Sequence, residues 1–198
     1  YLEVMAGRKG VPRLVTSVVS LFDAFWAMKR TSVSERIKPK EVKWEAVVDA
    51  LIDRMMQKQA LFAPATALDA CAETAKAMVS EGVLAEDDQR VGFFHEAFFD
   101  YCFARRFLGK GDDLLAFLKS GEQHLFKRAP LRQVLVHLHE SDRPEFIRQV
   151  KAILEDHGIR YHIKTAVLDT LKRLGSPCDR LWQLFAALLT SPARELAL

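Results

Sequence analysis

A single histidine, His95, stands inside the most aromatic stretch of the chain, residues 93–108. Six phenylalanines and one tyrosine share this stretch with Glu96 and Asp100 near its start and with two arginines near its end. An imidazole at the start of a helix, where backbone N–H groups are still unpaired, can hold an anion such as a phosphate group. The alternative is structural: His95 caps the helix or packs at the edge of the core among the phenylalanine rings.

Asp100, Tyr101 and Arg105 form a second polar group in the same stretch. One interpretation is a polar cluster between domains. The favoured interpretation is structural support, with the Tyr101 hydroxyl donating to a nearby carbonyl group. Asp100 and Arg105 are five residues apart, on near but different helix faces, so the spacing does not predict a direct salt bridge.

The remaining polar residues show no pattern typical of a metal centre or a catalytic site. The other five histidines are His124, His137, His139, His157 and His162. On a helix the rings of His137 and His139 would point roughly 200° apart, whereas a metal needs converging ligands. Asp87 and Asp88 lie in a predicted turn and are expected to be solvated. We therefore predict no metal site, no cofactor bound by this segment alone and no enzymatic activity of its own.

Composition favours an ordinary globular protein of one or two domains. The chain has 198 residues, 49% of them apolar and 28% charged, with a formal net charge of +3. This charge is too mild for a dedicated nucleic-acid binder. The three cysteines lack C-x-x-C spacing, as expected of reduced thiols in a cytoplasmic protein. The sequence shows no signal peptide and no membrane span, and its first residue is Tyr, so we expect a piece of a larger protein.

The elements that must position these side chains follow from apolar periodicity. It predicts helices over 16–36, 42–59, 67–80 and 93–108, a short strand over 61–64, and a β-hairpin with strands over 83–86 and 90–94. This order, preceded by a linker helix region over 1–40, is that of a winged-helix domain over 41–110. The wing carries Glu86, Asp87 and Asp88, so it is built to touch protein rather than DNA.

After residue 110 the pattern becomes purely helical. Five amphipathic segments are predicted, over 112–119, 131–139, 144–156, 161–174 and 177–189. The pair within 131–156 resembles the pair within 161–189 in apolar spacing, which indicates antiparallel helical repeats of the HEAT type over 111–198. The predicted fold class is therefore mainly α, with one small β-hairpin.

The aromatic stretch resembles a family signature. The pattern F-x-H-x-x-F-x-[ED]-Y-x-x-A-R closes the winged-helix domain of NACHT-type STAND NTPases, the NLR-like signalling and immune ATPases. The chain matches it with Phe93, His95, Phe98, Asp100, Tyr101, Ala104 and Arg105. Phe99 stands where many members carry Gln, and Asp100 replaces the more usual Glu. Residues 21–29 are similar to the helix that opens the segment between the nucleotide-binding core and the winged helix.

The resemblance implies a switch. In the resting state the winged helix would close over ADP held by the nucleotide-binding domain of the same protein, with His95 contacting the β-phosphate. ATP or ADP and Mg²⁺ would belong to that domain. A protein or other ligand acting on the C-terminal repeats would open the closed state and expose surfaces for oligomerisation, while Asp100, Tyr101 and Arg105 would serve structural or interdomain roles.

The chain departs from the family in one respect, since it contains no G-x-x-x-x-G-K-[ST] and no acidic strand end for Mg²⁺. Without these parts the segment has no site for phosphoryl transfer. Two other functions stay open: a winged-helix DNA-binding regulator, which the acidic wing disfavours, and a helical-repeat scaffold for protein interactions.

Overall fold

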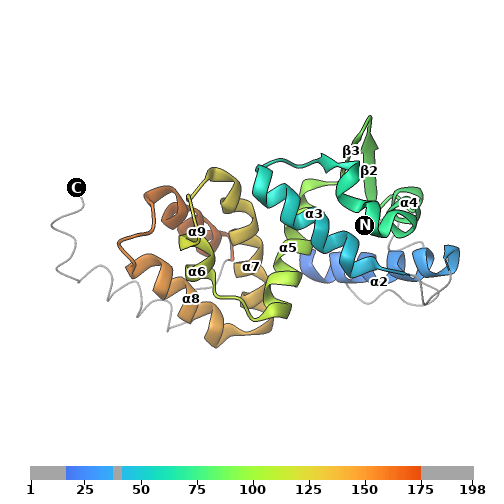
Figure 1. Cartoon of the computed structure of the whole chain (residues 1–198). Helices are drawn as coiled ribbons and strands as arrows, with labels where there is room; N and C mark the ends of the chain where they lie inside the picture. The colour runs from blue at the N-terminus through green and yellow to red at the C-terminus, as the bar shows by residue number, and fades with distance from the viewer. Residues whose placement is uncertain (1–16, 38–41, 175–198) are drawn as a thin grey trace, which may run out of the picture. The chain divides into compact units, whose positions relative to one another are not determined.

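The structure is a computed structural model that describes residues 17–37 and 42–174. These residues are mainly helical and include one small three-stranded antiparallel sheet, which confirms the predicted helical class with a minor β-element (Figure 1). The chain divides into two compact units, Tyr1–Arg106 and Phe107–Leu198. Across the described ranges no helix is both long enough and apolar enough to cross a bilayer.

Two long helices open the first unit, as predicted. Helix α2 spans Val18–Arg36 and helix α3 spans Trp44–Lys58. Ser17 caps α2 by accepting the Ser20 N–H at 3.1 Å, and the Ser20 hydroxyl accepts the Ser17 N–H in return at 3.2 Å. Such reciprocal bonds pair two otherwise orphaned donors and define where the helix begins. Helix α3 buries one stripe at helical spacing: Trp44, Val47, Val48, Leu51, Ile52 and Met55.

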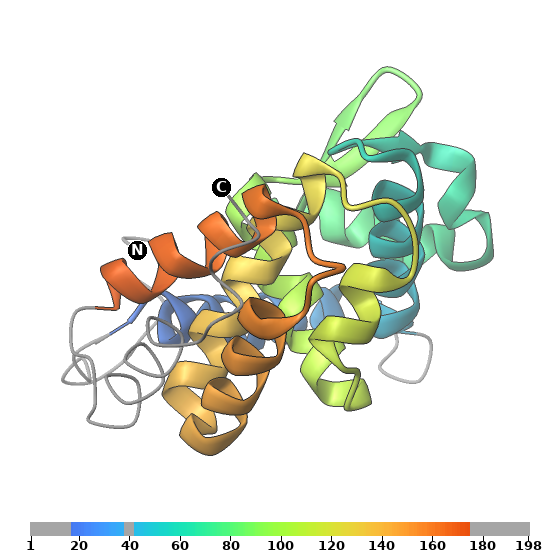
Figure 2. The ribbon, with the colours of Figure 1, turned by 90° about the vertical axis from the view of Figure 1, so that its left-hand side faces the viewer.

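The sheet has the order β1-β3-β2, with all pairs antiparallel. Its strands are β1 (Ala63–Pro64), β2 (Leu84–Asp87) and β3 (Arg90–Phe93). Pro64 lies on an edge strand, where proline is tolerated because it has no N–H to donate to a second neighbour. The β2–β3 hairpin turns at Asp88, whose φ is 57°, and projects beyond the helices of its own unit (Figure 2).

The helix predicted over 67–80 was wrong in its first half. Residues Ala65–Cys71 form a 3₁₀-helix, η2, and only Ala72–Ser80 are α-helical, as α4. The buried side chains of η2, Leu68 and Cys71, are three residues apart, and three residues per turn bring both to one side.

Helix α4 ends at a glycine with positive φ. Gly82 has a φ of 70°, a conformation that glycine adopts without steric penalty. The Val83 N–H donates to the Met78 carbonyl and the Gly82 N–H to the Val79 carbonyl, both at 2.9 Å. These two bonds form a Schellman motif, which satisfies carbonyl groups at the helix end and turns the chain into β2.

The aromatic helix, α5, spans Glu96–Lys110, so the prediction that it begins at Phe93 was wrong. Phe93 is the last residue of β3, and the Phe94 N–H still donates to the Val83 carbonyl at 3.1 Å. A residue held in this way cannot enter a helix. Helix α5 is apolar on two sides, because Phe98 and Tyr101 on one stripe and Phe99 and Phe103 on the other are all buried.

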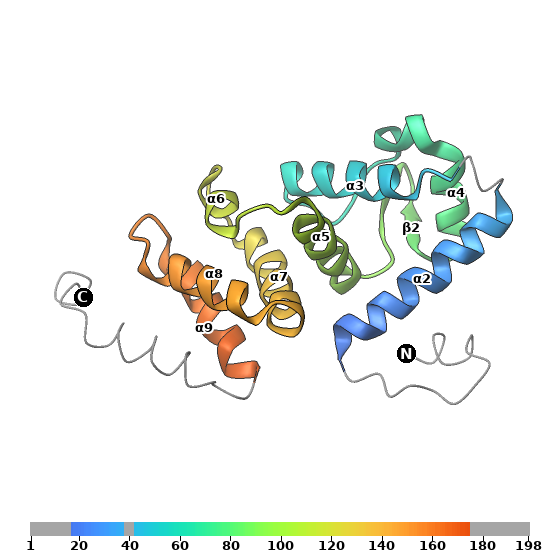
Figure 3. The same cartoon turned by 90° about the horizontal axis from the view of Figure 1, so that it is seen from below.

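The second unit contains four described α-helices (Figure 3). They are α6 (Leu114–Lys119), α7 (Arg128–Ser141), α8 (Arg143–Glu155) and α9 (Tyr161–Arg173), with a short 3₁₀ turn, η3, at Leu125–Lys127. Helix α7 packs against both α8 and α9. It begins earlier than the predicted residue 131 because Pro130 falls in its first turn, where proline is tolerated. The predicted helix over 177–189 lies outside the described residues.

Asp113 joins α6 to α8 through a polar network. One carboxylate oxygen of Asp113 caps α6 by accepting the Ala116 N–H at 2.9 Å, and the other accepts from Arg148 and Gln149, each at 3.2 Å. Arg148 also donates to both carboxylate oxygens of Glu145. The bond from Arg148 lowers the pKa of Glu145. Burial alone would raise the pKa of Asp113, but its bonds to Ala116, Arg148 and Gln149 outweigh that effect and lower it.

The close approach of β3 to the segment before β1 makes Gly92 a test of this packing. A Cβ at residue 92 would lie 2.4 Å from the backbone oxygen of Leu61, so Gly92→Ala should lower the free energy of unfolding by about 1–3 kcal/mol. Gly109→Ala is the control, because no atom lies within 4 Å of the added Cβ and alanine favours a helix by about 0.5–1 kcal/mol. Urea unfolding should give opposite signs for the two variants; equal effects would contradict the close approach.

The Asp113 network predicts an acid-sensitive second unit. The folded state lowers the pKa of Asp113 and of Glu145 below their ordinary values of 3.8 and 4.5. Their contribution to the free energy of unfolding is therefore present above those values and is lost as pH falls through the folded pKa. Arg148→Gln should therefore show a smaller drop in melting temperature between neutral and acidic pH than the parent chain. Arg173→Gln, at the end of α9, is the charge-matched control and should keep the full drop.

Candidate functional site

His95 lies between β3 and α5 and caps the helix. Its Nδ1 accepts the Ala97 N–H at 3.0 Å, and its carbonyl oxygen accepts the N–H groups of Phe98 at 3.0 Å and Phe99 at 3.2 Å. A ring nitrogen that accepts a backbone N–H carries no proton, so the neutral ring holds its proton on Nε2. Because His95 is exposed, this arrangement leaves an N–H donor for an external acceptor at the start of α5. The capping role and the anion-binding role are therefore compatible, since each uses a different nitrogen.

An apolar hollow of about 210 Å³ adjoins His95. Its other lining residues are Met55, Leu61, Phe62, Phe93, Phe94, Glu96 and Phe99. Two of them stay unusually open to solvent for their type, Phe94 at 41% exposed and Leu61 at 38%. An exposed apolar rim of this kind is typical of a surface that another protein module covers.

The Glu96 carboxylate is the opposing charge at this site. It is exposed and stands in the first turn of α5, one residue after His95. Its position is favourable for the helix dipole, but it repels a second anion at the same helix end. An anion bound here would meet one imidazole donor and one nearby negative charge, which limits the site to a weak, reversible contact.

Tyr101 and Arg105 converge on Asp23 of α2. The Tyr101 hydroxyl donates to Asp23 Oδ1 at 2.6 Å, and Arg105 Nη1 donates to the same oxygen at 2.9 Å and to the Tyr101 oxygen at 3.2 Å. The Arg105 guanidinium also lies 4.9 Å from the ring centroid of Trp26, within cation–π range. We call Asp23, Tyr101, Arg105 and Trp26 the α2–α5 clamp.

The α2–α5 clamp corrects one expectation drawn from the sequence. Tyr101 does give structural support, but its acceptor is a carboxylate and not a carbonyl group. Burial, and then the bond to Asp23, raise the pKa of Tyr101 well above its ordinary value. Asp100 is half-buried beside Tyr101, and the bonds that join Asp23, Tyr101 and Arg105 do not include it.

Sequence reasoning missed Asp23. The available signal was its position as a lone carboxylate in the apolar run 21–27, one helical turn before Trp26. A charged residue on the aromatic side of a helix needs a partner when that side is packed. Only the fold shows that its partners are Tyr101 and Arg105, which lie 78 and 82 positions further along the chain.

The histidines downstream make separate contacts. His137 Nδ1 lies 3.1 Å from the Gln133 carbonyl oxygen, and the His139 ring packs edge-on against Phe146 at a centroid distance of 5.2 Å. Within residues 17–37 and 42–174 no three His, Cys, Asp or Glu side chains come together as a group that could hold a metal ion. Cys71 and Cys102 are buried thiols, and burial raises the pKa of each.

Asp87 and Asp88 lie at the exposed turn of the β2–β3 hairpin, as predicted. Asp87 pairs with Arg90 at 2.7 Å across the turn, and Asp88 occupies the position with positive φ. An exposed pair of this type contributes little to stability.

Comparison of the chain with family models, with curated proteins and with solved structures found no match.

Tyr101→Phe tests the α2–α5 clamp. At neutral pH the free energy of unfolding of the variant should be about 1 kcal/mol lower, because the ring stays packed but its hydrogen bond to the Asp23 carboxylate is lost. Because the folded state raises the pKa of Tyr101, the parent chain should lose stability as pH rises above the unfolded value of 10.0. Thermal melts of the variant should show a shallower alkaline loss than the parent. Tyr161→Phe, at an exposed position on α9, is the control and should match the parent at neutral and at alkaline pH.

Proposed function

We propose that this chain is a regulatory segment of a cytoplasmic NACHT-type STAND NTPase. In this proposal residues 41–110 are a winged-helix domain that closes over ADP in the resting state, and residues 111–198 are HEAT-like repeats that respond to a ligand. The observation that carries the proposal is the His95 imidazole, which is exposed, oriented by the Ala97 N–H and left with Nε2–H as a donor. A phosphate oxygen of ADP is a suitable acceptor for such a donor.

The order of elements supports a winged helix. Helix α3, strand β1, the η2–α4 helical segment, the β2–β3 hairpin and then α5 follow one another as that domain requires. The hairpin turn is acidic, with Glu86, Asp87 and Asp88 all exposed. A DNA-binding wing needs cations for the phosphate backbone, so a protein surface is the better partner for this one.

The weakness of the anion contact suits a latch. A switch between two domain arrangements needs an energy difference of only a few kcal/mol, because a tighter contact would hold one state permanently. One imidazole N–H opposed by Glu96 supplies a contact of that order. Beside His95, the exposed ring of Phe94 and the exposed side chain of Leu61 give the nucleotide-binding domain an apolar surface to cover in the closed state.

The α2–α5 clamp supports rigid movement of the linker helix with the winged helix. Asp23 is bonded to Tyr101 and Arg105 on the same helix that carries His95 at its start. Release of His95 from a phosphate would therefore move α5 and α2 together.

The spacing of buried residues supports a repeat in the second unit. Helices α7, α8 and α9 each bury a set of side chains at positions i, i+3, i+4 and i+7, and α7 buries Pro130 in addition. These are Leu131, Val134, Leu135 and Leu138 in α7, Phe146, Gln149, Val150 and Ile153 in α8, and Ile163, Ala166, Val167 and Thr170 in α9. Equal patterns in successive helices are what stacked helical repeats need.

Two variants of His95 test the latch in the protein that contains this chain. His95→Ala removes both the helix cap and the Nε2 donor, whereas His95→Asn keeps an acceptor for the Ala97 N–H and has no donor that reaches as far as Nε2, because its own amide N–H groups end closer to the backbone. Both should release ADP roughly tenfold faster, the effect expected when one hydrogen bond to a charged group is lost. His157→Ala, at an exposed histidine of the second unit, is the control.

The measurement is the amount of ADP retained after gel filtration, followed by the rate of exchange with a fluorescent analogue. If His95→Asn retains ADP like the parent while His95→Ala does not, His95 acts through the helix cap alone and the latch is wrong. The assignment to the NTPase class has its own test in the coding sequence before Tyr1. A P-loop followed by an acidic strand end about 60–80 residues later is expected there, and a preceding domain without them would overturn the class.

A further inference from the structure

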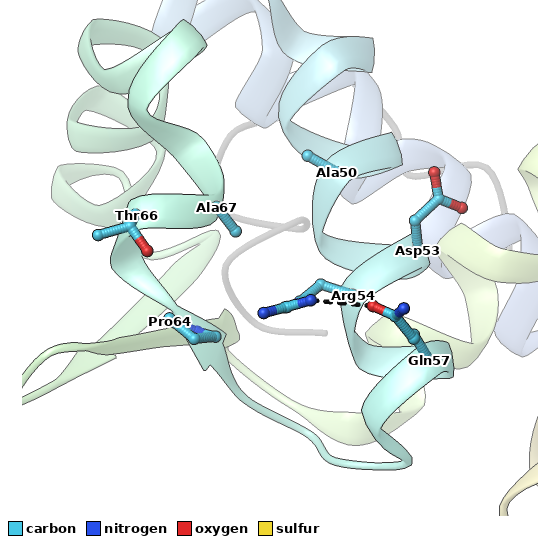
Figure 4. A pocket seen from close by; sticks show the side chains of 7 residues that line it. All are labelled: Ala50, Asp53, Arg54, Gln57, Pro64, Thr66 and Ala67. Atoms are coloured by element: carbon cyan, nitrogen blue, oxygen red, sulfur yellow. Dashed lines mark hydrogen bonds between the residues drawn. The ribbon is translucent and has the colours of Figure 1, made fainter.

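A polar groove separates α3 from the segment that leads from β1 into η2. It has a volume of about 640 Å³ and is lined by Ala50, Asp53, Arg54, Gln57, Pro64, Thr66 and Ala67 (Figure 4). The α3 residues stand at i, i+3, i+4 and i+7, so they form one face of the helix and one wall of the groove. The opposite wall comes from Pro64, Thr66 and Ala67. This groove does not include His95 or the α2–α5 clamp.

The charged group that the groove presents is the guanidinium of Arg54. Arg54 Nη1 donates to Gln57 Oε1 at 2.9 Å, and the guanidinium extends from α3 toward the wall that carries Pro64 (Figure 4). Its partner in the described part of the chain is thus a neutral amide and not a carboxylate. The hydrogen bond to the Gln57 amide orients the cation over the groove, and within residues 17–37 and 42–174 no ion pair with a carboxylate compensates its charge.

The other charge in the lining, Asp53, is paired with Arg106, which it shares with Asp49. Arg106 Nη2 lies 2.5 Å from Asp53 Oδ1, and Arg106 Nε lies 3.2 Å from Asp49 Oδ1. The Arg106 side chain is 18% exposed and the Asp53 side chain 67% exposed, so the pairing reduces the negative charge at Asp53 but stays in contact with water and salt. In Figure 4 the Asp53 carboxylate points away from Arg54. A ligand beside Arg54 therefore meets that guanidinium, while the Asp53 carboxylate is paired with Arg106 and turned away from Arg54 (Figure 4).

The rest of the lining restricts the class of ligand. The described lining residues include no aromatic and no large apolar side chain, so the groove offers nothing on which a nucleobase or a lipid tail could pack. Ala50 and Ala67 are small enough for a peptide backbone to approach closely. Pro64 adds apolar contact, and the exposed Thr66 adds a hydroxyl that can donate or accept.

We propose that this groove binds an acidic peptide segment of a partner protein, with a Glu or Asp carboxylate paired to Arg54. A guanidinium and a carboxylate match in geometry and pair through two parallel hydrogen bonds. A monoanion is favoured over a phosphate, because a doubly charged group would need a second cation. A peptide is favoured over a small free carboxylate, because the groove is open and only an extended ligand covers both walls at once.

Panning of a phage library of random short peptides on the purified full chain tests this assignment. The selected sequences should be enriched in Asp and Glu. Fluorescence polarisation of a selected peptide should then show about tenfold weaker binding to Arg54→Gln, and an intermediate affinity for Arg54→Lys, which keeps the charge but loses the paired donors. Arg173→Gln is the charge-matched control in the second unit and should bind like the parent.

Three outcomes would overturn the proposal. The first is selection without acidic enrichment, and the second is equal binding of the selected peptide and its version with Asn and Gln in place of Asp and Glu. The third is full competition by glutarate or inorganic phosphate at the concentration of the peptide, which would assign the groove to a small anion. Far-UV circular dichroism and the melting temperature of Arg54→Gln should match the parent, which separates loss of binding from loss of fold.

Discussion

Burial of α5 on two sides is the constraint on which the first unit depends. A helix with aromatic side chains around most of its circumference cannot lie on a surface, because each ring left in water would lose the free energy of its burial. Phe98 and Tyr101 meet the aromatic residues of α2, with ring centroids 5.2 Å apart for Phe98 and Phe25. On the side toward α3, Arg106 bonds to Asp49 and Asp53. The helix is therefore tied to both neighbours by apolar contact and by charge.

The start and the middle of α5 show how one helix can serve both structure and recognition. Near its middle, Tyr101 donates its single hydroxyl proton to Asp23, so this group stabilises the fold and has no donor left for a partner, and Arg105 donates from Nη1 to the same carboxylate. At its start, His95 uses only one ring nitrogen for the fold and keeps the other as a donor. The difference lies in burial, since Tyr101 is fully buried whereas His95 is exposed.

Arg54 and Arg106 illustrate the same principle with two arginines near one helix. Arg106 is largely buried and pairs with two carboxylates, as a buried charge must. Arg54 is oriented by an amide and keeps its charge for the groove. Both side chains satisfy the fold, but only Arg54 leaves electrostatic attraction for a ligand. In the second unit Arg148 resembles Arg106, because it also donates hydrogen bonds to two carboxylates, those of Glu145 and Asp113. The bond to Asp113 connects α8 to α6.

The sequence by itself determined the helices with a regular apolar stripe, the Gly82 helix end, the edge position of Pro64 and the two-sided burial of α5. Each follows from local periodicity or from the conformational limits of one residue type, which act over a few neighbouring positions. Tertiary structure decided the start of α5, because the bond from Phe94 to Val83 extends the sheet, and the 3₁₀ form of η2. It also decided the partners of Tyr101, Arg105 and Arg106. These outcomes depend on groups that are tens of residues away in the chain, and a sequence pattern carries no information on which of them will meet until the apolar faces have packed.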